Sequence, residues 1–344
     1  MAAADNLLSD AEKSTTSYQP LHPSVRPKLD PEYVAFHDKY IQFVEPDDVR
    51  PWHATHTRRR RPFPPGTSKS VPVKEVRDVD LGNFSVRIFW PEGEKPKSGW
   101  PALVWYHGGG WAIGGIENEN DFCSRMCRDA SCVVVTVGYR LCPEYPYPVP
   151  VEDSIEALVW VHGQAVSGSM DVDASRIAIG GTSAGGNLAV ATALKASLLQ
   201  PTPIPLILQL LIVPVIDNTA TVATAWSTRI HTPWLTPARM TWYRNMYLTN
   251  SKDALNWDAS PNLAPAELLA KTPKTWVGIA EQDLLAPEAA AFADQLRTAG
   301  VDVDVQYYPG MTHTILAMNG ILTKGKALVK DSAKVLKDIF WPAS

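Results

Sequence analysis

A series of almost continuous apolar runs, separated by segments with helical spacing, constrains the fold of this chain more than any other feature. Runs of this kind suit the strands of a parallel sheet that is covered by helices on both faces. The apolar runs lie at residues 102–107, 132–139, 176–180, 206–215 and 275–280. The helical candidates between them lie at residues 119–130, 151–166, 185–199 and 287–299. This order of strand and helix predicts the α/β class.

Three more segments alternate apolar and polar residues, as half-buried strands do. "VPVKEVRDVD" (71–80) and "NFSVRIFW" (83–90) have the pattern of an antiparallel pair, and "VDVDVQYYP" (301–309) alternates again. "ALVKDSAKVLKDIF" (327–340) has the spacing of an amphipathic helix. We therefore expect a mixed, mostly parallel sheet of eight strands that is flanked by helices.

Two parts of the chain fall outside this alternation. Residues 217–270 lie between two predicted strands and contain several aromatic residues and a predicted helix at 236–248. Residues 1–70 begin with a polar stretch and include a predicted helix at 31–44. We expect both parts to form a helical cap over the C-terminal edge of the sheet. The predicted division is an N-terminal segment that contributes to the cap (1–70), a first part of the core (71–216), the cap insertion (217–270) and a second part of the core (271–344).

The charge balance and hydropathy of the chain argue against several function classes. The net charge is −4, so no globally basic surface is available for nucleic acid. Residues are 45% hydrophobic and 20% charged, which is typical of a globular protein. The N-terminus lacks the pattern of a secretory signal, and "LILQLLIVPVI" (206–216) is too short to span a bilayer. We therefore expect a cytoplasmic protein that binds no nucleic acid and does not insert stably into a membrane.

Two clusters allow both a binding and a structural interpretation. The four cysteines, Cys123, Cys127, Cys132 and Cys142, contain no Cys-x-x-Cys pair, and no histidine lies among them. We predict reduced, mostly buried thiols and no metal site. The run Arg58–Arg61 is predicted to be a solvated charge run in a loop, with a targeting or phosphate-binding patch as the alternative.

Ser183 lies in a Gly-x-Ser-x-Gly sequence, Gly181-Thr182-Ser183-Ala184-Gly185, directly after the predicted strand "RIAIG" and directly before a predicted helix. A nucleophile elbow needs small flanking residues because its turn is so sharp that larger side chains would collide. The pattern alone also fits a glycine-rich connection without chemistry. Its position between strand and helix favours a nucleophilic serine.

A serine hydroxyl needs a base to take its proton, and the base needs a carboxylate to orient it. Asp283 in "GIAEQDLLAPE" and His313 in "YYPGMTHTIL" each follow a predicted strand and come in the chain order Ser, Asp, His. Loops at the C-terminal ends of strands are where the functional groups of open α/β sheets gather. We predict His313 as general base and acid, and Asp283 as the anion that fixes its tautomer.

Other residues compete for these two roles. Glu281 is an alternative acid, and Glu288 is expected in the first turn of the following helix, where an anion is favoured by the helix dipole. The alternative bases His107, His162 and His231 all precede Asp283 in the chain. A lone histidine is more often structural than catalytic, and only the position of His313 in the series distinguishes it.

"WYHGGGWAIGG" (105–115) supplies a glycine-rich loop after the first long apolar strand. Successive glycines let the backbone approach a ligand and point N–H groups at it. In acyl transfer, the N–H groups of Gly108, Gly109 and Ala184 are predicted to hold the oxyanion. A plain loop is the alternative. Nucleotide binding is disfavoured, because neither a P-loop lysine nor a Gly-x-Gly-x-x-Gly after the first strand of a βαβ unit is present.

Six segments in order carry a resemblance to a known family. They are the His107–Gly110 loop, "YRLCPEYPYPVPVED", "GTSAGGNLA", "LIVPVID", "AEQDLLAPEAAAFADQLRTAG" and "YYPGMTHTI". Over roughly residues 75–340 the chain resembles the hormone-sensitive lipase family of carboxylesterases, which has the α/β-hydrolase fold. The resemblance implies ester hydrolysis through an acyl-enzyme, a helical cap and no cofactor.

The same resemblance implies further roles and shows departures from the family. It implies that Glu152 and Asp153 tie the loop after strand 132–139 to the catalytic floor, and that a homodimer forms through the edge strand 301–308 or the last helix. Thr182 stands where family members often have Asp or Glu, which leaves the nucleophile in place. Thr314 stands where the family usually has glycine, so the histidine loop is expected to pack differently.

The substrate is the least constrained part of the prediction. Trp111, Trp234, Trp242 and Tyr243 are candidates for contacting a small to medium-sized, apolar ester, with packing of the cap onto the core as the alternative. Serine carboxylesterase is the leading function. An acyltransferase or lactone-processing enzyme of secondary metabolism that uses the same triad, and a receptor for a small molecule, are the alternatives.

Overall fold

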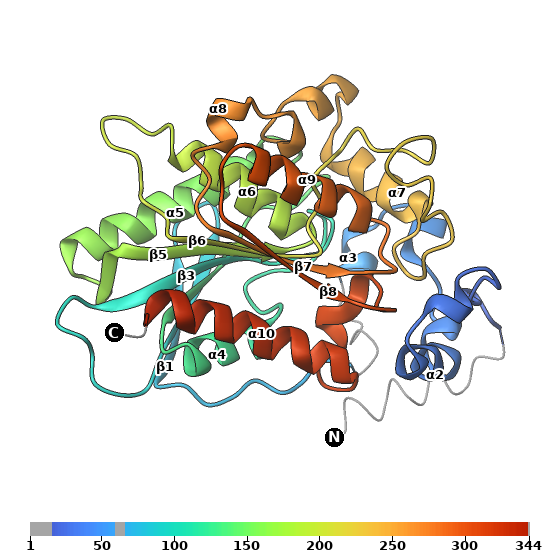
Figure 1. Cartoon of the computed structure of the whole chain (residues 1–344), viewed down its shortest axis with the longest axis horizontal. Helices are drawn as coiled ribbons and strands as arrows, with labels where there is room; N and C mark the ends of the chain where they lie inside the picture. Colours follow the sequence, from blue (N-terminus) through green and yellow to red (C-terminus); the bar gives the residue numbers. More distant parts are fainter. Residues whose placement is uncertain (1–15, 59–65, 343–344) are drawn as a thin grey trace.

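A computed structural model describes residues 16–58 and 66–342, and a single eight-stranded sheet lies at its centre (Figure 1). The strand order is β1-β2-β4-β3-β5-β6-β7-β8. The pairs β1–β2 and β2–β4 are antiparallel, and all other neighbours are parallel. The predicted mixed, mostly parallel sheet is confirmed. The strands are β1 (Glu75–Asp80), β2 (Ser85–Trp90), β3 (Trp100–Tyr106), β4 (Val133–Gly138), β5 (Val172–Thr182), β6 (Leu208–Ile212), β7 (Thr275–Ala280) and β8 (Val303–Tyr308).

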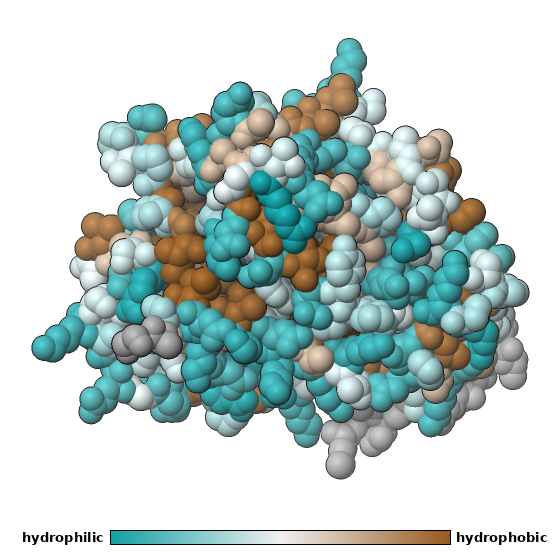
Figure 2. Space-filling view, in the orientation of Figure 1, coloured by the Kyte–Doolittle hydropathy of each residue, from teal (hydrophilic) through white to brown (hydrophobic). Residues whose placement is uncertain are grey.

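Helices cover both faces of this sheet, as the continuous apolar strands require. One face carries α5 (Val149–Ser167), α6 (Ala184–Ala196) and α9 (Ala286–Thr298), and the other carries α4 (Asn120–Asp129) and α10 (Thr323–Phe340) (Figure 1). Helix α10 is amphipathic: its buried side packs beneath the sheet. The exposed side of α10 carries Lys326, Lys330, Lys334 and Lys337. In the same orientation as Figure 1, the lower half of the surface in Figure 2 is mostly hydrophilic.

Two hydrophobic cores lie on opposite faces of the sheet, and β3 contributes to both. Its residues Ala102, Val104 and Tyr106 belong to the core beneath α5, α6 and α9. Leu103 and Trp105 belong to the core beneath α4 and α10. This assignment follows from the alternation of side chains along a strand. All seven residues of β3 are buried, which explains the uninterrupted apolar run in the sequence.

Several element boundaries differ from the predicted ones, each for a local reason. The apolar run 206–215 is a strand only to Ile212, because Val213 has a φ of 41° and turns the chain beside the end of β5. The predicted helix at 31–44 is divided into α2 (Pro31–Lys39) and a 3-10 turn, η2 (Ile41–Phe43). A 3-10 helix that the sequence did not predict, η6 (His313–Met318), follows β8.

The insertion 217–270 contains α7 (Pro237–Tyr247), η4 (Ser251–Leu255), η5 (Pro261–Leu263) and α8 (Ala266–Leu269). The N-terminal part contains η1 (Arg26–Lys28), α2, η2, η3 (Asp47–Val49) and α3 (Ala54–Thr57). The two parts contact each other on one side of the molecule (Figure 1). Asp48 accepts a hydrogen bond from buried Arg239 at 2.9 Å, and the rings of His22 and His231 stack at 3.7 Å.

Arg58 corrects the prediction of a solvated charge run. Its guanidinium donates to the carbonyl oxygens of Ala112 and Cys142, both at 2.9 Å, and pairs with Glu144 at 2.5 Å. This side chain therefore links the N-terminal part to two loops at the C-terminal ends of strands. Residues 59–61 of the run lie outside the described residues.

The four cysteines lie within the two hydrophobic cores of the protein. All four cysteines are buried and free, and burial raises the pKa of the Cys142 thiol to about 12. Within residues 16–58 and 66–342, no cluster of three or more His, Cys, Asp or Glu side chains could hold a metal ion. No helix in the same ranges is both long enough and apolar enough to cross a membrane.

Candidate active site

Ser183 stands at a sharp turn between the end of β5 and the start of α6. Its backbone has a φ of 55° and a ψ of −118°, a combination that residues other than glycine rarely adopt. The flanking glycines make this turn possible. A Cβ on Gly181 would lie 2.2 Å from the carbonyl oxygen of Gly185, and a Cβ on Gly185 would lie 2.0 Å from that of Tyr106. The motif therefore folds into the strained strand-to-helix turn that a nucleophile elbow requires.

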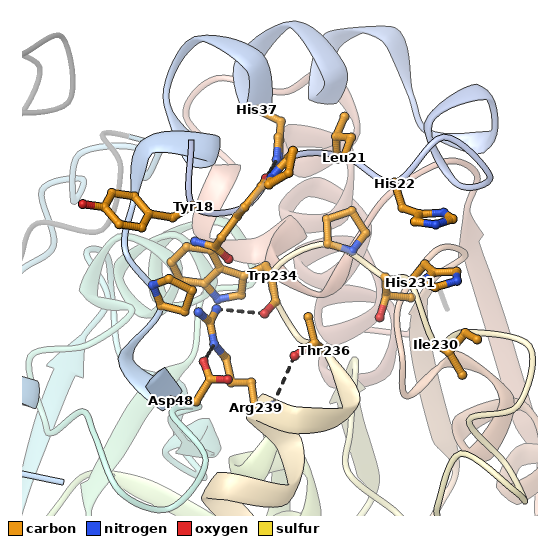
Figure 3. Close-up of a pocket in the computed structure, with 15 residues that line it drawn as sticks. Tyr18, Leu21, His22, His37, Asp48, Ile230, His231, Trp234, Thr236 and Arg239 are labelled. Atoms are coloured by element: carbon orange, nitrogen blue, oxygen red, sulfur yellow. Dashed lines mark hydrogen bonds and ion pairs between the residues drawn. The ribbon is translucent and has the colours of Figure 1, made fainter. Parts of the chain in front are cut away.

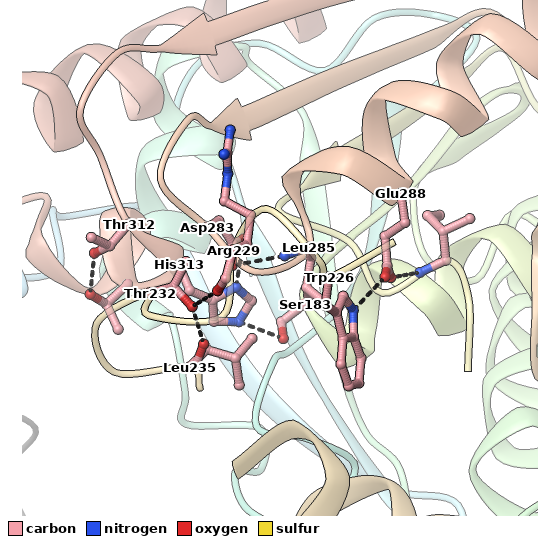
Figure 4. A network of polar contacts seen from close by, with 12 residues as sticks. Ser183, Trp226, Arg229, Thr232, Leu235, Asp283, Leu285, Glu288, Thr312 and His313 are labelled. Carbon is pink, nitrogen blue, oxygen red and sulfur yellow. Dashed lines mark hydrogen bonds and ion pairs between the residues drawn. The ribbon is translucent and has the colours of Figure 1, made fainter. Parts of the chain in front are cut away.

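The Ser183 hydroxyl, the His313 ring and the Asp283 carboxylate form a chain of hydrogen bonds (Figure 4). His313 Nε2 lies 2.8 Å from Ser183 Oγ, and His313 Nδ1 lies 2.8 Å from Asp283 Oδ2. Asp283 is buried, and its other oxygen accepts the Leu285 N–H at 3.2 Å. When Nδ1 donates to the carboxylate, Nε2 is free to accept the serine proton.

The competing carboxylates have other partners. Glu281 accepts the Gly310 N–H at 2.8 Å and so shapes the turn before the histidine loop. Glu288 is buried in the first turn of α9, as predicted, where it accepts the N–H of Ile216 at 2.9 Å and the indole N–H of Trp226 at 3.1 Å. Burial raises the pKa of Glu288 to about 8 although these donors oppose the shift. Asp283 alone of the three carboxylates contacts His313.

The competing histidines lie elsewhere. His107 is buried and stacked on Tyr139, and its Nδ1 lies 2.7 Å from the Gly108 carbonyl oxygen. Burial lowers the pKa of His107 to about 4, so its ring is neutral at pH 7. His231 stacks on His22, and His162 is half-buried on α5. Each of these positions fits a structural role.

The N–H groups of the glycine loop differ in whether they already have a hydrogen-bond partner. The Gly108 N–H donates to Glu119 Oε1 at 3.2 Å and is therefore occupied. Within the described part of the chain, the backbone N–H groups of Gly109, Gly110 and Ala184 donate no hydrogen bond to another backbone group. Gly109 and Gly110 have φ values of 120° and 58°, which place both in the region that favours glycine. The predicted donors were Gly108, Gly109 and Ala184, and the spacing of the motif does not show that the Gly108 N–H already has a partner.

The predicted substrate-binding aromatic residues divide into different environments. Trp111 is fully buried and stacks on Tyr247 at 4.2 Å, so packing accounts for its position. Tyr243 lies directly over the glycine loop, since a Cβ on Gly110 would come within 2.3 Å of the Tyr243 ring. Trp242 packs against Trp52 of the N-terminal part at 5.7 Å, which connects the insertion to that part.

Trp234 lines a cavity of about 280 Å³ between the N-terminal part and the insertion (Figure 3). The Arg239 guanidinium lies 4.6 Å from the centre of the Trp234 ring and also donates to the Trp234 carbonyl oxygen at 2.8 Å. Thr232, on the same loop as Trp234, is buried, and its hydroxyl donates to the carbonyl oxygens of Arg229 and Leu235 at 3.1 and 2.9 Å (Figure 4). These hydrogen bonds hold the loop that forms one wall of the cavity.

A model of the alpha/beta hydrolase fold family matches residues 103–317, a range that contains Ser183, Asp283 and His313. The chain belongs to this family. An AB hydrolase superfamily protein of Schizosaccharomyces pombe is 38% identical over 96% of this chain and 99% of its own length. Carboxylesterase NlhH of Mycobacterium tuberculosis is 32% identical over 84% of this chain and 89% of its own length. A solved thermostable esterase from Pseudomonas putida has a TM-score of 0.82 at 27% identity, over 92% and 99% of the two chains.

The predicted α/β-hydrolase fold is thus confirmed, and the chain is a carboxylesterase-like hydrolase. Two expectations from the family resemblance are resolved by the contacts of this hydrolase. Asp153 is buried and binds the backbone N–H of Arg140 at 2.8 Å and its guanidinium at 2.6 Å, which ties the loop after β4 to α5. Glu152 is exposed, and its charge, together with that of Asp153, helps to raise the pKa of the Arg140 guanidinium.

The two departures from the family pattern also have structural consequences in this hydrolase. Thr314 is buried, and its hydroxyl lies 3.2 Å from that of Thr312 and 3.8 Å from the sulfur of Met318. Its side chain therefore packs against the backbone turn η6, next to His313 in the chain. Thr182 is buried beside the glycine loop, where a Cβ on Gly108 would come within 2.8 Å of its methyl group.

Proposed function

We propose that this hydrolase cleaves carboxylic esters through an acyl-enzyme formed on Ser183. The observation that carries the proposal is the unbroken hydrogen-bond chain from Ser183 through His313 to buried Asp283, built on a strained turn. The names of carboxylesterase NlhH and of the Pseudomonas esterase agree with this chemistry. A receptor without catalysis would have no need to maintain a strained serine in contact with a base.

The reaction follows from the positions of these groups. As Ser183 Oγ attacks the ester carbonyl, its proton passes to His313 Nε2, and Asp283 stabilises the imidazolium that forms. The N–H groups of Gly109, Gly110 and Ala184 stabilise the negative charge on the carbonyl oxygen. His313 then protonates the leaving alcohol. In the second half of the reaction it activates water, which hydrolyses the acyl-enzyme.

The insertion 217–270 and the N-terminal part act as the cap that selects the substrate. Buried Arg239 of the insertion pairs with Asp48 of the N-terminal part, and the rings of His22 and His231 stack, so these contacts join the two parts. Tyr243 closes over the glycine loop, and the indole of Trp226, in the insertion, donates to Glu288 at the start of α9 (Figure 4). These aromatic surfaces suit a small to medium-sized apolar ester.

Labelling with a fluorophosphonate and turnover of p-nitrophenyl esters test this function. The wild type is expected to be labelled and to hydrolyse the esters. Ser183→Ala should lose both properties, and His313→Ala should lose turnover by several orders of magnitude. Ser167→Ala, at the exposed end of α5, serves as the matched control and should behave like the wild type. Hydrolysis that survives Ser183→Ala would refute the mechanism, and transfer of the acyl group to added alcohols in preference to water would identify an acyltransferase.

A further inference from the structure

Glu119 is a carboxyl group beneath the glycine loop that the proposed mechanism does not use. It lies just before α4 with a φ of 61° and reaches back toward β3. Its Oε1 accepts the Gly108 N–H at 3.2 Å, and its Oε2 accepts the indole N–H of Trp105 at 2.7 Å. Trp105 is fully buried against Phe122, with the ring centres 4.6 Å apart, so the indole provides a rigid anchor for the carboxyl group.

The backbone at Gly108 is held from several directions. Glu119 binds its N–H, and the His107 Nδ1 lies 2.7 Å from its carbonyl oxygen. The hydroxyl of Tyr139 donates to the His107 carbonyl oxygen at 2.8 Å, which fixes the same peptide group that carries the Gly108 N–H. The orientation of the next peptide groups depends on these contacts, since Gly109 and Gly110 have no side chains to restrict them.

We propose that Glu119 is a positioning residue that binds the Gly108 N–H and thereby directs the N–H groups of Gly109 and Gly110 toward the oxyanion. This inference rests on the proposed ester hydrolysis at Ser183. Glu119 does not touch the substrate. It selects which N–H groups of the glycine loop stay available, because the Gly108 N–H is already satisfied by the carboxyl group.

The charge of Glu119 matters because the oxyanion forms on the same loop. Burial raises the pKa of Glu119 to about 8, and the nearby carboxylate of Asp121 adds to the shift, while Trp105 and Gly108 oppose it. Cys123 and Tyr139 also face this carboxyl group. At pH 7 the side chain is therefore mainly neutral. Ionisation above pH 8 places a negative charge beside the developing oxyanion and slows the reaction.

The decisive variant is Glu119→Gln. Both carboxyl oxygens face N–H donors, and in the neutral acid each oxygen, including the protonated one, keeps a lone pair that can accept. An amide NH₂ group cannot accept, so glutamine satisfies only one of the two donors. We expect kcat to fall about 10-fold to 100-fold, which is less than the roughly 10²-fold to 10³-fold loss on removal of an oxyanion donor, because the donors are displaced and not deleted. KM should change by less than about threefold. Trp105→Phe removes the second donor. The double variant Trp105→Phe/Glu119→Gln should therefore have a higher kcat than Glu119→Gln alone.

Asp121→Asn is the matched control. Asp121 is a buried carboxylate at the start of α4 whose Oδ2 accepts from Asn319 at 2.6 Å and from Ser68 at 3.2 Å, away from the glycine loop. At pH 6, where Glu119 is neutral with or without the charge of Asp121, Asp121→Asn is expected to lower the melting temperature without a comparable loss of kcat. A folded Glu119→Gln with wild-type kcat, or an equal loss of kcat in Asp121→Asn, would overturn the positioning role.

The pH profile supplies a second test that a purely structural role would not pass. The kcat of the wild type should fall severalfold between pH 7 and pH 9.5, and Glu119→Gln should lack this decrease. If the variant does not fold, a wild-type kcat that stays constant over this range overturns the inference. Fluorophosphonate labelling separates ester hydrolysis at Ser183 from the positioning role of Glu119. A wild type that is neither labelled nor active refutes the proposed function. A labelled, active wild type together with a Glu119→Gln variant of wild-type kcat refutes only the role of Glu119.

Discussion

Replacing Glu288 with glutamine should change how the stability of this hydrolase depends on pH. Glu288 is buried at the start of α9 and accepts the backbone N–H groups of Ile216 and Asp217 and the indole N–H of Trp226, at 2.9, 3.3 and 3.1 Å. These contacts fix the point where the insertion leaves β6. The carboxyl group therefore connects the folding of the core to the position of the insertion.

The sign and size of the effect follow from the pKa. Burial raises the pKa of Glu288 from 4.5 to about 8 in the folded state. Between these pH values the folded protein binds more protons than the unfolded chain, so the free energy of unfolding decreases as the pH rises. At about 1.4 kcal/mol per pKa unit, the loss contributed by Glu288 reaches at most about 5 kcal/mol and is complete above pH 8.

Glutamine at position 288 does not titrate, so this contribution disappears. Its amide can accept from the backbone of Ile216 but presents its NH₂ group to the Trp226 N–H, which leaves one buried donor unpaired. At pH 5 the variant should therefore be less stable than the wild type by about 1–3 kcal/mol. As the pH rises to 8, the difference should shrink and then reverse, because only the wild type loses stability through this group.

Urea unfolding at half-unit steps from pH 5 to pH 8.5 measures both curves. Glu119 is present in both proteins and contributes equally, so the difference between the two free energies isolates Glu288. Parallel curves, with a constant difference across this range, would refute the conclusion that Glu288 is mainly protonated at low pH in the folded state. Ester turnover on the same samples shows whether loss of this contact also displaces the insertion.

Four further substitutions, two of them a matched pair, test other contacts. Gly185→Ala places a Cβ 2.0 Å from the Tyr106 carbonyl oxygen and should prevent a stable fold. Gly163→Ala, in an open position on α5, should raise the free energy of unfolding in urea by about 0.5–1 kcal/mol. Similar stability of the two variants would contradict the geometry of the elbow. Arg58→Ala should lower the free energy of unfolding by about 1–3 kcal/mol, and an unchanged value would show that its carbonyl contacts add no stability. Asp283→Asn should lower kcat by about 10⁴-fold in an ester assay, since the tautomer of the base is lost, and retention of activity would assign the acid to another residue.

The sheet and the order of the candidate catalytic residues were predictable because both depend on local patterns. A strand buried on both faces must be apolar along its whole length, and β7 coincides with the predicted range 275–280. The Gly-x-Ser-x-Gly turn has its own signal, since the backbone atoms that exclude a Cβ at Gly181 belong to the same motif. Asp283 and His313 were recognisable from their positions after strands.

The features that the sequence did not reveal depend on contacts between distant segments. The carbonyl partners of Arg58 lie 54 and 84 residues further along the chain. Because no local pattern reveals them, the run Arg58–Arg61 was predicted to be solvated. Glu288 was predicted only as an anion in a first helical turn, because its partners at Ile216 and Trp226 lie about 60–70 residues earlier. In both cases the tertiary structure, and not the local pattern, determines what the charged group does.

The glycine loop shows the same division within a single motif. Three consecutive glycines allow the backbone to turn toward a substrate, but they do not determine which N–H groups face it. That choice depends on Glu119, which takes the N–H of Gly108, and on His107 and Tyr139, which hold the adjoining peptide group. Hydrolases with the same glycine loop and a different residue at the position of Glu119 are therefore expected to differ in kcat and in its pH dependence. Two identical motifs can position different donors, and the residue beneath the loop decides between them.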